Sequence, residues 1–161
     1  MAAIQGDIFG GGLELIISCH LRIMASSARI KMPELQFGFI PGWGGTQRLP
    51  RIVGKSKAFE MYMTADTYGA AELLACGLVN KLAAWEEVLS EAEILAKKII
   101  KSSPEAVSEI IRIINKTQNM HLYEGLQVEN EGVIKTVNSL ETFQRASRVF
   151  PKLKDIPRIT F

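Results

Sequence analysis

The chain has 161 residues, of which 47% are hydrophobic and 22% are charged, and its formal net charge is +2. This composition is that of a globular protein and excludes a disordered chain, and a charge this small without a basic, aromatic-rich stripe argues against nucleic acid as a partner. No apolar run approaches the about 20 residues that a membrane span needs, and no basic segment follows Met1, so neither a membrane anchor nor a signal peptide is expected.

Short strands and helices alternate over the first 84 residues, which is typical of an α/β fold. We expect strands at residues 2–5, 21–25, 28–32 and 78–82, and helices at residues 11–19, 46–52, 56–64 and 70–75. The first strand, helix and second strand indicate a right-handed crossover. Residues 37–45 are too rich in glycine and proline for regular structure. Pro50 is expected to bend or end its helix, and Gly77 to follow the last of these helices as the C′ residue.

The rest of the chain has only helical patterns. Helices are expected to begin near residue 86 and at Pro104, with Ser103 as N-cap, and to span residues 121–137 and 140–149. The second of them has one apolar face, formed by Val107, Ile110, Ile111 and Ile114. We therefore predict an α/β portion at residues 1–84 and a helical portion at residues 85–161 that ends in an extended tail at 151–157.

The two cysteines, Cys19 and Cys76, lie far apart and outside any metal-ligand spacing. We interpret them as reduced, buried thiols and expect no metal site. Reduced thiols suit a reducing compartment. The expected location is the cytoplasm, or the mitochondrion in a eukaryote if a targeting segment lies outside this chain.

The most informative stretch is Gly10-Gly11-Gly12, which lies between an apolar segment and an apolar helical run. We interpret it as a chain that leaves a strand, turns tightly and opens a helix. Consecutive glycines leave backbone N–H groups accessible to a ligand, and a helix N-terminus adds unpaired donors and partial positive charge. Such a turn suits an anion, or a carbonyl oxygen that becomes anionic during a reaction.

Two carboxylates accompany this turn. Glu14 lies in the first turn of the predicted helix, and Glu34 follows Pro33, which restricts the local backbone. Taken singly, Glu14 reads as an acid that complements the helix dipole and Glu34 as an exposed loop carboxylate. Together with the glycines they predict acid–base chemistry beside an activated carbonyl.

These residues, with three further motifs, resemble the crotonase superfamily, specifically the enoyl-CoA hydratases. The motifs that carry the resemblance are Ile4-Gln5-Gly6, Gly10-Gly11-Gly12-Leu13-Glu14-Leu15, Met32-Pro33-Glu34, Gly38-Phe39-Ile40-Pro41-Gly42-Trp43-Gly44-Gly45-Thr46-Gln47-Arg48-Leu49 and Cys76-Gly77-Leu78-Val79. They follow one another in order and at matching spacing over residues 2–132.

The resemblance implies that residues 1–84 are the second half of a ββα superhelical core, and that residues 85–161 are helices that assemble homotrimers or hexamers. It also implies an N-terminal half, without a counterpart in this chain, that supplies a second oxyanion donor and much of the coenzyme A pocket. We therefore expect these residues to be the C-terminal portion of a hydratase, weakly active or inactive alone.

The resemblance also assigns roles to particular residues. The N–H of Gly11 holds the thioester carbonyl oxygen, Glu34 protonates the α-carbon, and Glu14 orients and activates the water. Gly42 matches a position whose N–H touches that water, and Trp43 is expected to line the acyl pocket or to serve only in loop packing. An acyl-CoA thioester is then the substrate, and no separate cofactor is expected.

Two alternatives remain open from the sequence. One is an enoyl-CoA isomerase or another enolate chemistry, which in this fold usually works with one of the two acids; the presence of both Glu14 and Glu34 favours hydration. The other is a non-catalytic fragment that associates with its relatives through long apolar helix faces.

Overall fold

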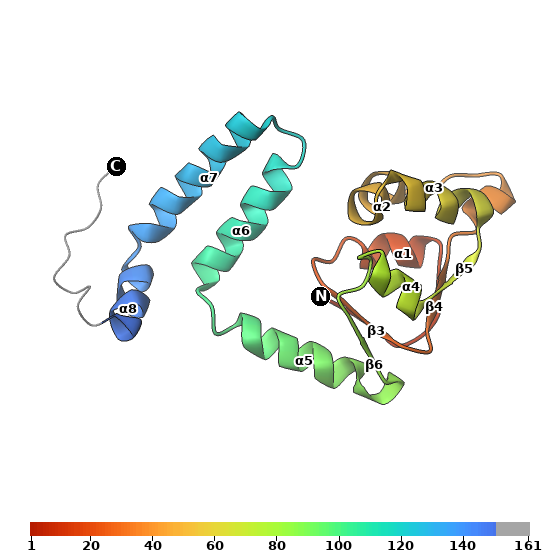
Figure 1. The fold of residues 1–161 in the computed structure, drawn as a ribbon, viewed down its shortest axis with the longest axis horizontal. Coiled ribbons are helices and arrows are strands. Elements are labelled where there is room, and N and C mark those ends of the chain that lie inside the picture. The colour runs from red at the N-terminus through yellow and green to blue at the C-terminus, as the bar shows by residue number, and fades with distance from the viewer. Residues whose placement is uncertain (151–161) are drawn as a thin grey trace. The chain divides into compact units, whose positions relative to one another are not determined.

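The computed structural model describes residues 1–150 (Figure 1). Contacts within the chain divide it into two compact units, one from Met1 to Ala96 and a second that starts at Lys97. The division falls within helix α5 (Val88–Ile99). The assignment of residues 1–84 and 85–161 to two domains stays a prediction, and the predicted tail at residues 151–157 lies outside the described residues.

A parallel three-stranded sheet forms the centre of the first unit, with strand order β1-β3-β6. Its strands are β1 (Ala2–Ile4), β3 (Arg22–Ala25) and β6 (Lys81–Ala83). Ala2 pairs with Arg22 and Ile23 with Lys81. The predicted crossover from the first strand through a helix to a parallel second strand is therefore confirmed, although its handedness is not tested. β3 is the middle strand of this sheet, and all of its residues are buried.

Arg22 explains why β6 begins later than the predicted strand at residues 78–82. The buried Nε of Arg22 donates to the Leu78 carbonyl at 2.5 Å, and the Arg22 N–H donates to Asn80 Oδ1 at 2.8 Å. These bonds occupy residues 78–80 before the strand ladder starts. Burial lowers the pKa of the Arg22 guanidinium, which also donates to the Cys19 carbonyl.

A second sheet, with order β2-β4-β5, was missed by the sequence analysis except for its middle strand. β4 (Arg29–Lys31) corresponds to the predicted strand at residues 28–32, whereas β2 (Ile8–Phe9) and β5 (Thr67–Gly69) were not predicted. Strands of two and three residues are too short to show alternation. β2 matters for function because it is the strand that leads directly into the three glycines.

Helices of the first unit lie close to their predicted positions. They are α1 (Gly11–Ile16), α2 (Gly45–Val53), α3 (Lys55–Thr64) and α4 (Ala70–Ala75), with a 3₁₀ turn η1 (Glu34–Phe37). α1 ends earlier than predicted because Ser18 bonds the Leu15 carbonyl through both its N–H and its hydroxyl, which tightens the last turn. Pro50 does not end α2, which continues to Val53. Gly77 has φ +78 at the predicted C′ position of α4.

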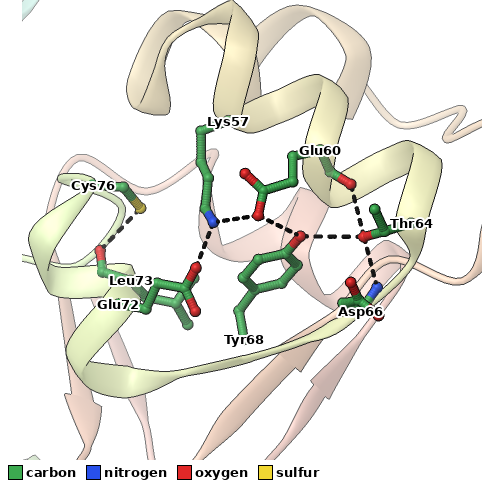
Figure 2. Close-up of polar contacts among 8 residues, drawn as sticks. All are labelled: Lys57, Glu60, Thr64, Asp66, Tyr68, Glu72, Leu73 and Cys76. Carbon is green, nitrogen blue, oxygen red and sulfur yellow. Dashed lines mark hydrogen bonds and ion pairs between the residues drawn. The ribbon is translucent and has the colours of Figure 1, made fainter.

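An ion pair fastens α3 to α4, and a cation–π contact and hydrogen bonds fasten it to β5 (Figure 2). Lys57 Nζ lies 2.5 Å from Glu72 Oε1 and 2.9 Å from Glu60 Oε1, and it lies 4.3 Å from the centre of the Tyr68 ring. The Tyr68 hydroxyl in turn lies within hydrogen-bond distance of Thr64 and Glu60. The bonds to Glu72 and then Glu60 raise the pKa of the Lys57 ammonium. This network fixes the position of α3 relative to α4 and β5.

A short 3₁₀ turn, η2 (Trp85–Glu87), precedes α5, and the described part of the second unit continues with three more helices. α6 (Pro104–Thr117), α7 (Leu122–Val137) and α8 (Leu140–Val149) match the predicted segments. Ser103 caps α6 by accepting from the Ala106 N–H, as predicted. α6 and α7 lie side by side (Figure 1). A β-carbon at Gly132 would lie 2.5 Å from Ile113 Cδ1, so glycine permits this close helix packing.

One charged side chain is buried between α6 and α7. Glu109 is 5% exposed, and its Oε1 accepts from Lys135 Nζ at 2.5 Å while its Oε2 accepts from Arg112 Nε at 2.7 Å. The bonds from Lys135 and then Arg112 lower the pKa of Glu109 below its ordinary value of 4.5. A carboxylate with a lowered pKa stabilises the folded state at pH values above its unfolded pKa and loses that contribution as the pH falls through its folded pKa.

We expect Glu109→Gln to lower the melting temperature at pH 7 and to lower it less as the pH falls below about 4.5. The amide cannot form ion pairs with Lys135 and Arg112, but protonation removes the same pairs from the wild type. Circular dichroism melts of both proteins between pH 3 and pH 7 measure the difference. A difference that stays constant over this range would contradict the ion-pair explanation.

Candidate active site

The glycine elbow, which we define as Gly10, Gly11 and Gly12, joins β2 to α1. Gly10 has φ +49; its N–H donates to the Lys31 carbonyl of β4 at 3.0 Å, and its carbonyl accepts from the Leu13 N–H at 2.8 Å. Gly11 and Gly12 open α1, where the first N–H groups have no intrahelical acceptor. The predicted turn from strand to helix is therefore present, with β2 as its strand in place of residues 2–5.

Glu14 holds the loop that faces the elbow. Its side chain is 3% exposed, and Oε1 accepts from the Trp43 N–H and from the Gly45 N–H, each at 2.7 Å. A β-carbon at Gly45 would lie 2.9 Å from the same oxygen, so glycine is needed for this approach. Two backbone donors hold Oε1, which leaves Oε2 as the oxygen available to another group.

Glu34 opens η1, directly after Pro33, and is 5% exposed. Its Oε1 lies beside the elbow, since a β-carbon at Gly10 would be 2.5 Å from it. Its Oε2 is buried and has no hydrogen-bond partner among residues 1–150. Burial rules out the alternative, considered for Glu34 taken singly, of an exposed loop carboxylate. A buried polar atom without a partner is uncommon enough to indicate a functional role.

Both glutamates line one cavity of about 460 Å³ together with Gly11, Gly42 and Trp43. The other lining residues are mainly apolar: Phe9, Gly10, Pro33, Phe37, Phe39, Ile40 and Pro41. All five site residues singled out from the sequence therefore meet at one place. The sequence analysis missed the aromatic lining, in which the rings of Phe37 and Phe39 stack with centroids 6.2 Å apart.

Trp43 covers the elbow while remaining largely open to solvent. A β-carbon at Gly11 would lie 2.6 Å from Cζ3 of the indole, although the side chain is 74% exposed. Any residue other than glycine at position 11 would therefore displace this ring. Trp43 therefore packs against the elbow and forms part of the cavity wall, and its role in lining an acyl pocket stays a prediction.

Arg48 is a site residue for which the sequence analysis proposed no role. From α2, its Nη2 donates to the Glu14 carbonyl at 3.2 Å and to the Trp43 carbonyl, and a β-carbon at Gly44 would lie 2.5 Å from its Nη1. Arg48 thus ties the loop to the helix that bears Glu14. Arg48 belongs to the motif at residues 38–49 that carries the family resemblance, but the motif alone does not indicate that its side chain ties the loop to α1.

Within residues 1–150, no group of three or more histidine, cysteine, aspartate or glutamate side chains could hold a metal ion. Over the same residues, no helix is both long and apolar enough to span a membrane. The arrangement offers elbow N–H donors, two buried carboxyl groups and an apolar rim. Chemically, such a site can stabilise a developing oxyanion and transfer protons to neighbouring atoms.

A short elbow with two buried acids, set in a mixed α/β unit, defines a crotonase-like protein. Comparison of structures supports this class: enoyl-CoA hydratase subunit I from Geobacillus kaustophilus HTA426 matches with a TM-score of 0.86 and 32% identity, over 99% of this chain and 62% of that one. The enoyl-CoA hydratase/isomerase family model matches residues 1–151. The chain belongs to the enoyl-CoA hydratase/isomerase family.

Two other relatives bear on function. The probable enoyl-CoA hydratase of Bacillus subtilis (strain 168) is 42% identical over 126 residues, which are 78% of this chain and 48% of that protein. A putative enoyl-CoA hydratase from Thermobifida fusca YX, solved in complex with acetoacetyl-CoA, matches with 27% identity and a TM-score of 0.78, over 81% of this chain and 51% of that one. The chain spans about half the length of the curated relatives it matches.

Proposed function

We propose that this chain provides the two acids and one oxyanion donor of an enoyl-CoA hydratase. The reaction is syn addition of water to a trans-2-enoyl-CoA thioester, which gives a 3-hydroxyacyl-CoA. The observation that carries the proposal is the convergence of buried Glu14, buried Glu34 and the Gly11 elbow on one cavity. The family to which the chain belongs and the acetoacetyl-CoA bound to the Thermobifida fusca relative support an acyl-CoA substrate.

In the proposed mechanism the Gly11 N–H donates to the thioester carbonyl oxygen and draws electron density from the double bond, which makes the β-carbon electrophilic. Oε2 of Glu14 orients a water for attack there, since Oε1 is held by Trp43 and Gly45. Glu34 delivers a proton to the α-carbon. The water oxygen thus bonds to the β-carbon, and the carbon–carbon double bond becomes single. One proton of the water stays on the new hydroxyl group, and the other passes to the acid pair and replaces the proton that Glu34 delivered.

The two-acid geometry favours hydration over double-bond isomerisation. An isomerase moves one proton between carbons of the substrate and in this fold usually works with one acid, whereas hydration needs a water oriented at one carbon and a proton delivered to its neighbour. Both Glu14 and Glu34 reach the cavity here. Their shared access to one cavity fits the addition of both parts of a water to the same substrate face.

The function is tested by following the loss of the conjugated thioester absorbance of crotonyl-CoA. Two samples are compared: the 161 residues alone, and the natural-length protein, by which we mean these residues with any coding sequence that adjoins them. We expect hydration by the natural-length protein. The 161 residues alone should be slower by about 10²–10³-fold or more, because loss of one oxyanion donor costs that much. A natural-length protein that binds acyl-CoA without consuming crotonyl-CoA would contradict the proposal.

We further propose that the helices after residue 97 assemble copies of the chain into a homotrimer or hexamer. Ile110 and Ile114, on the predicted apolar face of α6, are 59% and 54% exposed, and Leu122 and Leu126 of α7 are 80% and 50% exposed. Exposed apolar side chains spaced along packed helices are typical of a surface that another chain covers.

The double variant Ile110→Asp/Ile114→Asp is expected to dissociate this assembly into monomers, because burying two carboxylates in an apolar interface is unfavourable. Light scattering at micromolar concentration measures the particle mass of variant and wild type. Lys116→Asp, on an exposed position of the same helix outside the apolar face, serves as control. A wild type that is monomeric at this concentration would remove the assembly proposal.

We also propose that the protein works in a reducing compartment, because its two cysteines form no disulfide. Cys19 and Cys76 are free and partly buried, which suits the cytoplasm or, in a eukaryotic source, the mitochondrial matrix.

A further inference from the structure

Tyr62 contributes a buried hydroxyl for which neither the fold nor the proposed mechanism accounts. It lies on α3, the helix that also carries Lys57 and its network (Figure 2), and it is 9% exposed. Its Oη is fully buried and has no hydrogen-bond partner among residues 1–150. Buried hydroxyls are nearly always paired. We therefore expect the Tyr62 hydroxyl to donate to an acceptor through a bridging water.

The nearby charges identify the acceptor region. Burial, then the charge of Glu14, then the charge of Glu34 raise the pKa of Tyr62 to about 12, so the phenol stays protonated and lies within electrostatic range of both acids. α3 packs against η1, which carries Glu34, and against α2, which carries Arg48.

Glu34 is the acid whose free oxygen is buried. Oε1 of Glu14 accepts from two backbone N–H groups, and its Oε2, which the proposed mechanism uses to orient water, is not among the buried unpartnered atoms of the described residues, whereas Oε2 of Glu34 is. A buried donor and a buried acceptor, each without a partner, therefore occur on two elements in contact. One water between them would satisfy both groups, and ordered waters serve this purpose in protein interiors.

We propose that Tyr62 is a positioning residue for Glu34, whose Oε2 it reaches with a hydrogen bond through one buried water. The bond holds the carboxyl group so that Oε1 stays beside the elbow, at the mouth of the cavity. The catalytic consequence, though not the bond itself, rests on the proposed hydratase function.

A high-resolution crystal structure of the wild-type protein, without substrate, tests the bond directly. The expected result is a water within about 3.2 Å of both Tyr62 Oη and Glu34 Oε2, and its loss or displacement in Tyr62→Phe. Tyr68→Phe is the matched control, because Tyr68 is also buried but bonds Thr64 and Glu60 instead. A Tyr62 hydroxyl that bonds another group in the wild type would overturn the proposal, even if Tyr62→Phe failed to fold.

The kinetics of crotonyl-CoA hydration by the natural-length protein test the consequence. Tyr62→Phe should lower kcat about tenfold with KM within about twofold of wild type. A kcat within about twofold of wild type, or a loss that falls on KM and not on kcat, would refute the positioning role. If the wild type hydrates nothing, the function fails while the crystallographic result still decides the bond.

Discussion

Glu34→Gln is expected to lower kcat for crotonyl-CoA hydration by the natural-length protein by about 10²–10⁴-fold, and Glu14→Gln by a similar factor. An amide cannot donate the proton that the α-carbon needs or act as a base toward the water. In Glu14→Gln the amide oxygen can still accept from the Trp43 and Gly45 N–H groups, so the loop should stay in place. The loss is therefore expected in kcat with little change in melting temperature, measured by the absorbance assay and by circular dichroism.

Glu87→Gln is the control for these substitutions, because Glu87 is an exposed glutamate of η2 outside the cavity. It should leave both kcat and KM unchanged. Turnover like that of wild type in either Glu14→Gln or Glu34→Gln would remove the two-acid mechanism. If only Glu14→Gln retained activity, chemistry with one acid, as in an isomerase, would become the better explanation.

The chemical identity of the site could be predicted from the sequence because its signals are local. Three consecutive glycines, an acid in the next helical turn and an acid after a proline each restrict their own neighbourhood, and family resemblance supplies their combination. The structure places Glu14 and Glu34 on one cavity with Gly11. What the sequence could not show is that both carboxyl groups are buried, because burial depends on segments that approach from elsewhere in the chain.

Non-local contacts account for the features that the sequence analysis missed. Arg48 reaches the carbonyl groups of Glu14 and Trp43 across a loop, and Tyr62 lies within electrostatic range of both acids on a helix that is distant in sequence. No periodicity or spacing encodes either arrangement. The sheet β2-β4-β5 was incomplete in the prediction for a related reason, since strands of two or three residues are stabilised by their partners and not by a local pattern.

The apolar face of α6 shows that a correctly predicted helix does not reveal which of its faces packs within the chain. The pattern correctly predicted the helix, but within residues 1–150 its Ile110 and Ile114 remain exposed while Glu109 is buried against Lys135 and Arg112. A helical period shows which residues share a face, and it does not show what covers that face. The face of α6 that packs against α7 is set by the ion pairs of Glu109 with Lys135 and Arg112 and by the close approach of the two helices at Gly132.

Gly10→Ala is expected to reduce kcat by about 100-fold or more without removing any catalytic group. The new β-carbon would lie 2.5 Å from Glu34 Oε1, and Gly10 has φ +49, which is unfavourable for alanine. The carboxyl group must move, and a displacement of about 1 Å is enough to cost two orders of magnitude. The positive φ should also cost about 1–3 kcal/mol of stability in alanine, measured by urea unfolding alongside the activity assay.

Gly54→Ala separates the two effects, because Gly54 has φ +81 but a β-carbon there meets nothing within 4 Å. This variant should lose stability through its backbone and keep its activity. The decisive comparison is a double-mutant cycle in which Gly10→Ala is added to Glu34→Gln. If the alanine acts by displacing the Glu34 carboxyl group, it should cost little further activity once that group is gone. A full additional loss in the double variant would mean that Gly10 shapes the oxyanion donor at Gly11 and not the position of the acid.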